Sequence, residues 1–148
     1  MKPVLKFLAG LWTLRDYPTP EGEWRIEEKF AEVKRRGFEA VGGRFVPEAP
    51  ALCAEHGLDY ILYIDSDAFD YGKQFRRARD WNPQRVDVQL CEHDTPPEEA
   101  VRAWTGMVAL AEELGLEINL ELHRDTATKG RSSRPKLLAS WKRFSSST

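Results

Sequence analysis

The sequence has no apolar run long enough to cross a membrane. The apolar stretch from Met1 to Trp12 is interrupted by Lys6 and is far shorter than the ~20 residues that a membrane helix needs. It also lacks a small-residue cleavage site before Arg15 and Asp16, which argues against a secretory signal peptide. We interpret this stretch as a buried strand, and we expect a cytoplasmic protein without a membrane partner.

Cysteine is scarce, and no charge of one sign dominates. Cys53 and Cys91 are far apart and belong to no CxxC or Cys/His spacing, so we expect buried, reduced thiols rather than a disulfide or a zinc site. A formal net charge of -2 gives no electrostatic case for nucleic acid as the partner of the whole chain. With 148 residues, 41% of them hydrophobic, the chain has the composition of one globular domain.

A junction of glycine, a large apolar residue, an acid and an apolar run occurs three times, at Gly37–Val41, Gly57–Ile61 and Gly115–Asn119. Glycine is favoured there because the residue that follows a helix often needs a positive φ. Each junction therefore predicts the end of a helix and the start of a strand.

Apolar periodicity predicts the helices that precede these junctions. Ile26, Phe30 and Val33 share one helical face, and Val101, Trp104, Val108 and Ala111 share another. For the second helix, Thr95 is the expected N-cap, followed by prolines and by Glu98 at the capping-box position. Shorter helices are expected over Ala49–His56 and Tyr71–Ala78.

Strands are expected between these helices, near Val4–Leu8, Phe38–Val41, Tyr60–Ile64, Val86–Cys91 and Ile118–His123. Strict alternation of strand and helix predicts a parallel sheet. The strand starts recur at a mean spacing of about 28 residues, so eight units would need roughly 225 residues, close to the usual size of a (β/α)₈ barrel. The sequence has room for about five such units.

The last two strands alternate apolar with polar residues. Ile118, Leu120 and Leu122 alternate with Asn119, Glu121 and His123, and Val86, Val88 and Leu90 alternate with Asp87, Gln89 and Cys91. Parallel strands that are buried on both faces read as continuous apolar runs, so polar residues on one face favour the interior of a barrel that leads to a polar site. An open flavodoxin-like sheet is the alternative that five units leave open.

In parallel barrels the active site lies at the carboxyl ends of the strands. The polar residues at those positions are Trp12 and Arg15, Arg44, Asp65 and Asp67, Glu92 and His93, then Glu121, His123, Arg124 and Asp125. A solvated strand-end glutamate, a histidine bonded to a neighbouring strand and a core tryptophan are the plain alternatives for Glu121, His123 and Trp12.

The stretch Glu117–Thr126 resembles the fifth strand of the xylose-isomerase-like family of sugar isomerases and epimerases, an apolar strand that ends in Glu-x-His. The resemblance extends more loosely from Val4 to Thr128, through Trp12 at a strand end, Gly-Phe-x-x-Val at Gly37–Val41, and Ala-Glu-Glu-Leu-Gly before the fifth strand.

This resemblance implies a divalent metal, Mn²⁺, Mg²⁺, Co²⁺ or Zn²⁺, and a sugar or sugar phosphate as substrate. Glu121 matches the family's first metal ligand and can also move the substrate proton, while His93, His123, Arg124 and Trp12 are expected to bind substrate. Such a metal would stabilise an enediolate or polarise the carbonyl for a hydride shift.

The family's other ligands come from the sixth to eighth strands, for which this sequence has no counterpart. After Thr128 the sequence becomes basic and rich in serine, and its last acidic residue is Asp125. We therefore predict an incomplete barrel over residues 1–128 and a tail over 129–148, either partly disordered or a short helix, and we expect a frameshift or premature stop as its origin. Lys, Arg and aromatic residues in the tail suit nucleic acid or a membrane surface, but neither is the expected partner.

The sequence predicts a fragment of a metal-dependent sugar (phosphate) isomerase or epimerase that is weakly active or inactive by itself. One glutamate cannot make a metal site, so tight binding of the metal by this chain is not expected. The alternatives are a related metal-dependent lyase or endonuclease-like barrel, and a non-catalytic protein that associates through open barrel edges, including as a homo-oligomer.

Overall fold

The computed structural model describes residues 5–66, 70–124 and 126–129. The chain divides into two compact units, one formed by Met1–Tyr63 with Pro83–Arg85 and the other by Ile64–Asn82 with Val86–Thr148. Asp67, Asp125 and the predicted tail from residue 130 onward lie outside the described residues. None of the helices in the described part of the chain is long and apolar enough to cross a membrane.

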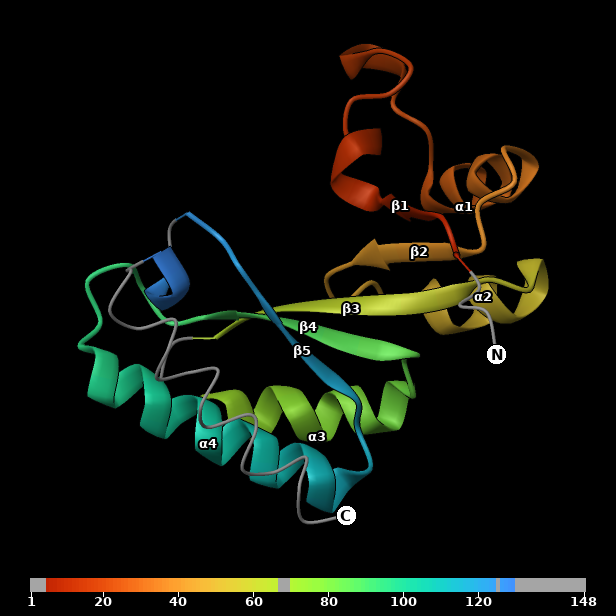
Figure 1. The fold of residues 1–148 in the computed structure, drawn as a ribbon. Helices are drawn as coiled ribbons and strands as arrows, with labels where there is room; N and C mark the ends of the chain where they lie inside the picture. The colour runs from red at the N-terminus through yellow and green to blue at the C-terminus, as the bar shows by residue number, and fades with distance from the viewer. Residues whose placement is uncertain (1–4, 67–69, 125, 130–148) are drawn as a thin grey trace. The chain divides into compact units, whose positions relative to one another are not determined.

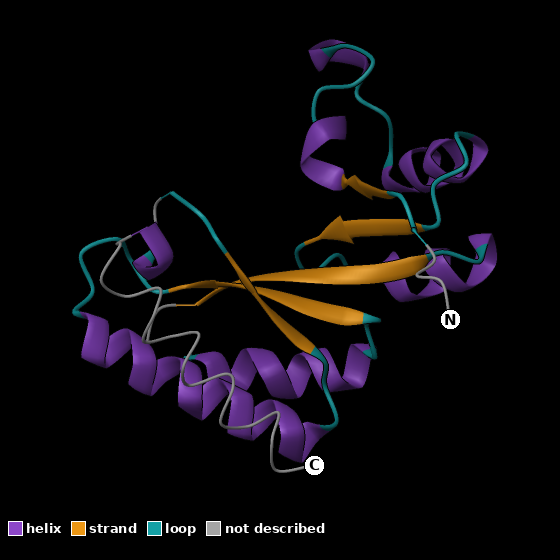
Figure 2. Ribbon diagram, in the orientation of Figure 1, coloured by secondary structure: helices purple, strands orange, loops and turns teal. Residues whose placement is uncertain are grey.

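Strands and helices alternate along the chain (Figures 1 and 2). The strands are β1 (Leu8–Gly10), β2 (Ala40–Gly43), β3 (Asp59–Ser66), β4 (Arg85–Leu90) and β5 (Ile118–Glu121). The helices are α1 (Ile26–Arg35), α2 (Ala49–His56), α3 (Tyr71–Trp81) and α4 (Pro97–Leu114). Short 3₁₀ turns are η1 (Leu11–Leu14), η2 (Pro20–Gly22) and η3 (Ala127–Lys129).

The sheet has five parallel strands in the order β1-β2-β3-β4-β5. A flavodoxin-like sheet has the order 2-1-3-4-5, so that alternative is wrong. Right-handed crossovers between strands that are neighbours in sequence place successive helices on the same face of the sheet. In agreement, α1 packs against α2 in the first unit, and α3 packs against α4 in the second.

The core of the second unit lies between β4 and its two helices. Val86, Val88 and Leu90 are fully buried, as are Phe75 of α3 and Met107 of α4. Burying side chains of this size contributes about 1.5–3 kcal/mol each. The apolar half of the β4 alternation therefore faces the helices, as expected.

The first unit repeats this arrangement. Phe30 and Val33 of α1 are buried, with Val41 of β2 and Tyr60 and Leu62 of β3. Val41 and Tyr60 are paired in register, so they point to the same side of the sheet. In β3, alternate residues build the core and the residues between them lie on the opposite face.

The glycine junctions are confirmed. Gly37, Gly57 and Gly115 all have positive φ, of 84°, 59° and 68°. The helix over Ala49–His56 is confirmed with its predicted bounds. Helix α3 runs three residues further than the predicted Tyr71–Ala78, because it ends on Asn82 in the left-handed conformation, which asparagine tolerates.

The predicted start of α4 is wrong in detail. The helix begins at Pro97 with Pro96 as its N-cap, and no side chain caps it. The Thr95 hydroxyl instead accepts a hydrogen bond from the backbone N–H of Glu92, at 3.2 Å. Thr95 therefore closes the turn before the helix rather than the helix itself.

The predicted first and last strands have the wrong bounds. Residues 5–7 are not strand, and β1 starts at Leu8, because its register with β2 pairs Leu8 with Ala40, the first residue of β2. The fifth strand ends at Glu121 rather than His123, because the backbone N–H of His123 donates to the Thr128 hydroxyl at 3.1 Å.

Both cysteines are buried and neither is in a disulfide, as predicted. Burial raises the pKa of the Cys53 thiol to about 11, with a further contribution from the charge of Asp59. Because the thiolate is the reactive form, this shift disfavours a nucleophilic role for Cys53 at neutral pH.

We predict that Gly115→Ala lowers the free energy of unfolding by about 1–2 kcal/mol, the cost of a left-handed backbone for a residue with a Cβ. No atom of the described residues lies within 4 Å of the added Cβ, so the effect isolates the backbone conformation. Urea denaturation measures it. Gly72→Ala in α3 is the matched control: its Cβ has room, 3.9 Å from the nearest atom of Leu110, and we expect about 0.5 kcal/mol of stabilisation. Equal effects of the two substitutions would contradict the assignment.

Candidate functional site

The polar face of β4 and β5 carries two hydrogen-bonded side-chain pairs. Asp87 lies beside Asn119, and Gln89 lies beside Glu121, in the register of the two strands. The Asn119 amide donates to Asp87 Oδ1 at 2.9 Å, and the Gln89 amide donates to Glu121 Oε2 at 3.1 Å. The sequence placed all four residues on this face but predicted only Glu121 as a site residue.

Glu121 is the last residue of β5 and is half-buried. The hydrogen bond from Gln89 restrains its carboxylate on the face away from the helices, at the carboxyl end of the strand. This is the position at which parallel β/α folds carry their chemistry. Gln89, which positions the Glu121 carboxylate, was not predicted from the sequence as a site residue. Its place on the same face of the preceding strand was the only indication.

The segment after β5 is closed by two threonines. Thr128 is fully buried, and its hydroxyl lies 2.7 Å from that of Thr126. The Thr126 hydroxyl also donates to the backbone carbonyl of His123. His123 is half-buried, whereas Arg124 is exposed. The structure thus uses the His123 backbone to end the strand.

His93 is exposed in the loop between β4 and α4. The alternation that should place it beside β5 is broken at Cys91, which adopts a positive φ of 51° directly after β4. The backbone N–H of Cys91 donates to Ser66 at 2.7 Å, which holds this turn in place. Within the described residues, the structure records no contact between the His93 ring and Glu121.

Trp12 forms an aromatic wall with Tyr63 in the first unit. The two rings meet edge to face with their centroids 5.2 Å apart. They lie over two glycines that are paired in register, Gly10 of β1 and Gly42 of β2. A Cβ at Gly10 would overlap the Trp12 ring, and one at Gly42 would overlap the Tyr63 ring. The glycines therefore make room for the rings.

Trp12 is 58% exposed, so the plain alternative of a core tryptophan is wrong. Tyr63 is the second residue that the sequence reasoning missed. Its side chain lies on the face of β3 opposite to the one that carries the buried residues Tyr60, Leu62 and Ile64.

Two other strand-end candidates, Arg44 and Asp65, offer backbone carbonyls as hydrogen-bond acceptors. Arg44 is exposed, and its carbonyl accepts the Tyr60 hydroxyl at 2.6 Å. Asp65 is exposed within β3, and its carbonyl accepts the Gln74 amide at 3.3 Å. Burial raises the pKa of Tyr60, so this hydroxyl stays a neutral donor.

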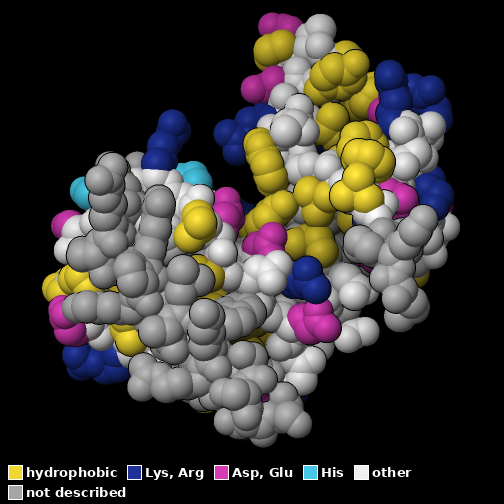
Figure 3. Space-filling view, in the orientation of Figure 1, with side chains coloured by type: hydrophobic (Ala, Val, Ile, Leu, Met, Phe, Trp, Pro, Cys, Tyr) yellow, Lys and Arg dark blue, Asp and Glu magenta, His cyan; other side chains and the backbone are white. Residues whose placement is uncertain are grey.

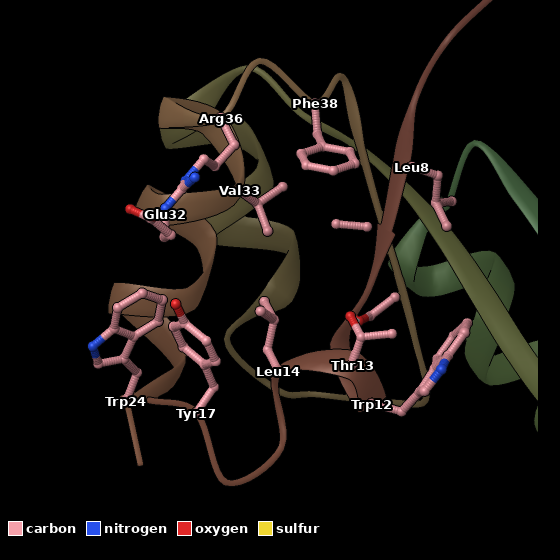
Figure 4. A pocket seen from close by; sticks show the side chains of 12 residues that line it. Leu8, Trp12, Thr13, Leu14, Tyr17, Trp24, Glu32, Val33, Arg36 and Phe38 are labelled. Atoms are coloured by element: carbon pink, nitrogen blue, oxygen red, sulfur yellow. Dashed lines mark hydrogen bonds and ion pairs between the residues drawn. The ribbon is translucent and has the colours of Figure 1, made fainter. Parts of the chain in front are cut away.

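A pocket of about 640 Å³ lies alongside β1 in the first unit (Figure 4). Leu14, Val33 and Phe38 point into it, whereas Leu8 and Trp12 lie on the far side of β1. Tyr17 and Trp24 close one end, with ring centroids 4.7 Å apart.

The rim of this pocket carries an ionic cluster on α1 and the residue after it. Glu32 accepts hydrogen bonds from Arg35 at 2.5 Å and from Arg36 at 2.7 Å. The hydrogen bonds from Arg35 and then Arg36 lower the pKa of Glu32 to about 2. The rim therefore keeps its charges at any ordinary pH, while the pocket wall is apolar.

The described residues bring together no group of three or more His, Cys, Asp or Glu side chains that could hold a metal ion. A catalytic metal takes about three protein ligands and an open position. Glu121 offers one carboxylate, one oxygen of which accepts from Gln89. The described residues by themselves do not fit the metal that the resemblance implies.

Comparison of the chain with models of known protein families finds no match, and a search of curated proteins finds no relative either.

We predict that Gly42→Ala displaces the Tyr63 ring and with it the edge contact to Trp12, because the added Cβ would overlap that ring. The aromatic signal in near-ultraviolet circular dichroism should fall, with a loss of about 1–3 kcal/mol of stability. Gly22→Ala is the control, since its Cβ meets only Thr19 Oγ1 at an ordinary 3.4 Å. An unchanged aromatic spectrum in Gly42→Ala would show that the wall does not depend on this glycine.

Proposed function

We propose that this chain is the N-terminal, five-unit part of a (β/α) barrel that acts as a metal-dependent sugar (phosphate) isomerase or epimerase. The strand order supports the barrel, since a barrel's strands follow one another in chain order with their helices on one face. In the second unit, the other face of β4 and β5 carries two polar pairs, as the interior of a barrel with a polar site would.

The observation that carries the enzymatic proposal is the Gln89–Glu121 pair. Proton transfer between carbons next to a sugar carbonyl needs a carboxylate that is held in one orientation near the substrate. The Gln89 amide donates to one oxygen of Glu121 and leaves the other oxygen to accept the proton. Glu121 is also the residue that matches the family's Glu-x-His strand.

Trp12 supports a sugar as the substrate. An exposed indole that is held edge to face by Tyr63 offers a flat apolar surface, on which the C–H face of a sugar ring or chain can pack. His93, His123 and Arg124 remain proposed substrate-binding residues on the strength of the resemblance alone.

The proposed metal would need further ligands beyond those that the described residues supply. A divalent ion would polarise the substrate carbonyl and stabilise the developing enediolate. Glu121 is the one described residue that we assign to it. The chain's own contribution is then to hold the carboxylate and to present the aromatic wall.

We predict that titration of the chain with Mn²⁺ in a calorimeter shows no submicromolar site, because a single carboxylate is too few ligands. Glu121→Gln should therefore change the titration little. Tight binding that Glu121→Gln abolishes would show that this chain holds a complete metal site, and the proposal of a partial barrel would then fail.

A ketopentose phosphate is the probe for the proposed function, with NMR detection on the chain labelled with ¹⁵N. We predict that it shifts the indole N–H signal of Trp12 and the side-chain amide signal of Gln89, while the indole of Trp81 on α3 serves as an internal control. Glu121→Gln should remove the Gln89 shift, and Glu117→Gln should keep it, because Glu117 precedes β5 at its other end. Shifts at neither reporter, or equal shifts at Trp81, would count against a sugar site.

A further inference from the structure

The 3₁₀ turn η3 follows β5 after a short loop (Figure 1). Two threonines at this turn, Thr126 and Thr128, are only 4% and 0% exposed. Burying a hydroxyl costs free energy unless it is hydrogen-bonded, so the partners of these two side chains matter. Those partners are backbone groups at the end of β5, within the same compact unit.

The Thr128 hydroxyl lies at the centre of these hydrogen bonds. It accepts from the backbone N–H of His123 at 3.1 Å and lies 2.7 Å from the Thr126 hydroxyl. The carbonyls of Glu121 and His123 are each 3.4 Å away from it. One side chain therefore reaches the backbone on both sides of the residue that ends the Glu-x-His stretch.

One arrangement of the two hydroxyl protons closes a ring of hydrogen bonds around His123. The His123 N–H donates to Thr128, Thr128 donates to Thr126, and Thr126 donates to the His123 carbonyl. Each hydroxyl then donates once and accepts once, and buried chains of this kind strengthen their own bonds. Both backbone groups of His123 are fixed, and with them the direction in which its side chain leaves the chain.

The backbone that these threonines hold carries the candidate site. Register pairing between β4 and β5 ends at Gln89 and Glu121, and the Gln89 amide donates to the Glu121 carboxylate at 3.1 Å. The space-filling view shows histidine side chains at the surface over the region where β4 and β5 end (Figure 3). The sheet thus restrains the chain up to Glu121, and the threonines restrain it from Glu121 to His123.

We propose that Thr126 and Thr128 are positioning residues of the candidate site. Their hydroxyls hold the backbone from Glu121 to His123, which keeps the Glu121 carboxylate against Gln89 and the imidazole of His123 at the strand end. The proposal rests on the proposed function only in treating Glu121 and His123 as site residues. Because the hydroxyl is the group that acts, serine should replace threonine and valine should not.

The test is a double-mutant cycle on the full chain labelled with ¹⁵N, read from the side-chain amide signal of Gln89 by NMR. In the wild-type chain, Glu121→Gln should shift this signal, because the amide loses its carboxylate acceptor. Thr128→Val has nearly the same shape without the hydroxyl, and in this background the shift should fall to roughly half or less. Thr128→Ser keeps the hydroxyl and should restore the full shift.

Thr105→Val is the matched control. The Thr105 hydroxyl donates to the Val101 carbonyl at 2.8 Å within α4, so this variant also loses a hydrogen bond from a threonine to the backbone. It leaves the hydrogen bonds at the end of β5 in place, and the response of Gln89 to Glu121→Gln should be unchanged.

A full response of Gln89 in a folded Thr128→Val chain would overturn the proposal, because the threonines would then only close the loop. Far-ultraviolet circular dichroism reports whether this chain folds. If it does not, Thr126→Val takes its place, since it opens the ring but leaves the His123 N–H its acceptor. This variant should also lower the response, and a full response in it would overturn the proposal in the same way.

A ketopentose phosphate separates this proposal from the proposed function. The compound should shift the Gln89 signal in the wild-type chain and in Thr128→Ser, and shift it less in Thr128→Val. If the wild-type chain does not respond to it while the cycle shows coupling, the proposed function fails and the positioning role stands. If the wild-type chain responds but the cycle shows no coupling, the positioning role fails and the proposed function stands.

Discussion

The pleat of a parallel strand sorts its side chains into two sets, and in β4 one of these sets is fully buried. Val86, Val88 and Leu90 meet the helices and are fully buried, while Asp87 and Gln89 of the same strand bond to β5 on the opposite face. Because the strands follow chain order, α1 packs against α2 in the first unit and α3 packs against α4 in the second. The opposite face is thereby left for polar side chains, and the candidate site depends on this separation.

The same constraint explains why the apolar residues of β5 are less buried than those of β4. An internal strand has a neighbour on each side and helices over its apolar face, so β4 buries its apolar set completely. Among the described residues, strand β5 has β4 on one side only, and Ile118 and Leu120 stay half-buried. In the first unit, α1 and the segment through Tyr17 and Trp24 line the pocket beside β1.

Much of the fold could be read from local signals, and the failures came from contacts between distant segments. The turns at Gly37, Gly57 and Gly115 could be predicted, because a positive φ depends on a single residue. The first strand was misplaced because its start is set by where β2 begins, through the pairing of Leu8 with Ala40. Thr95 has a side chain typical of an N-cap, but its hydroxyl accepts a hydrogen bond from the backbone N–H of Glu92 instead. For Gln89 and Tyr63, the sequence indicated only the face of the strand on which each side chain lies.

The sequence by itself determined the alternation of strand and helix, the polar face of β4 and β5, the buried thiols and the position of Glu121 at a strand end. These follow from periodicity and residue chemistry within short windows. Only the tertiary structure showed the strand order, the hydrogen bond between Gln89 and Glu121, and the exposed position of His93. It also showed that Gly10 and Gly42 make room for the rings of Trp12 and Tyr63. Each of these depends on register between strands or on one backbone turn, and neither is encoded in the spacing of residues along the chain.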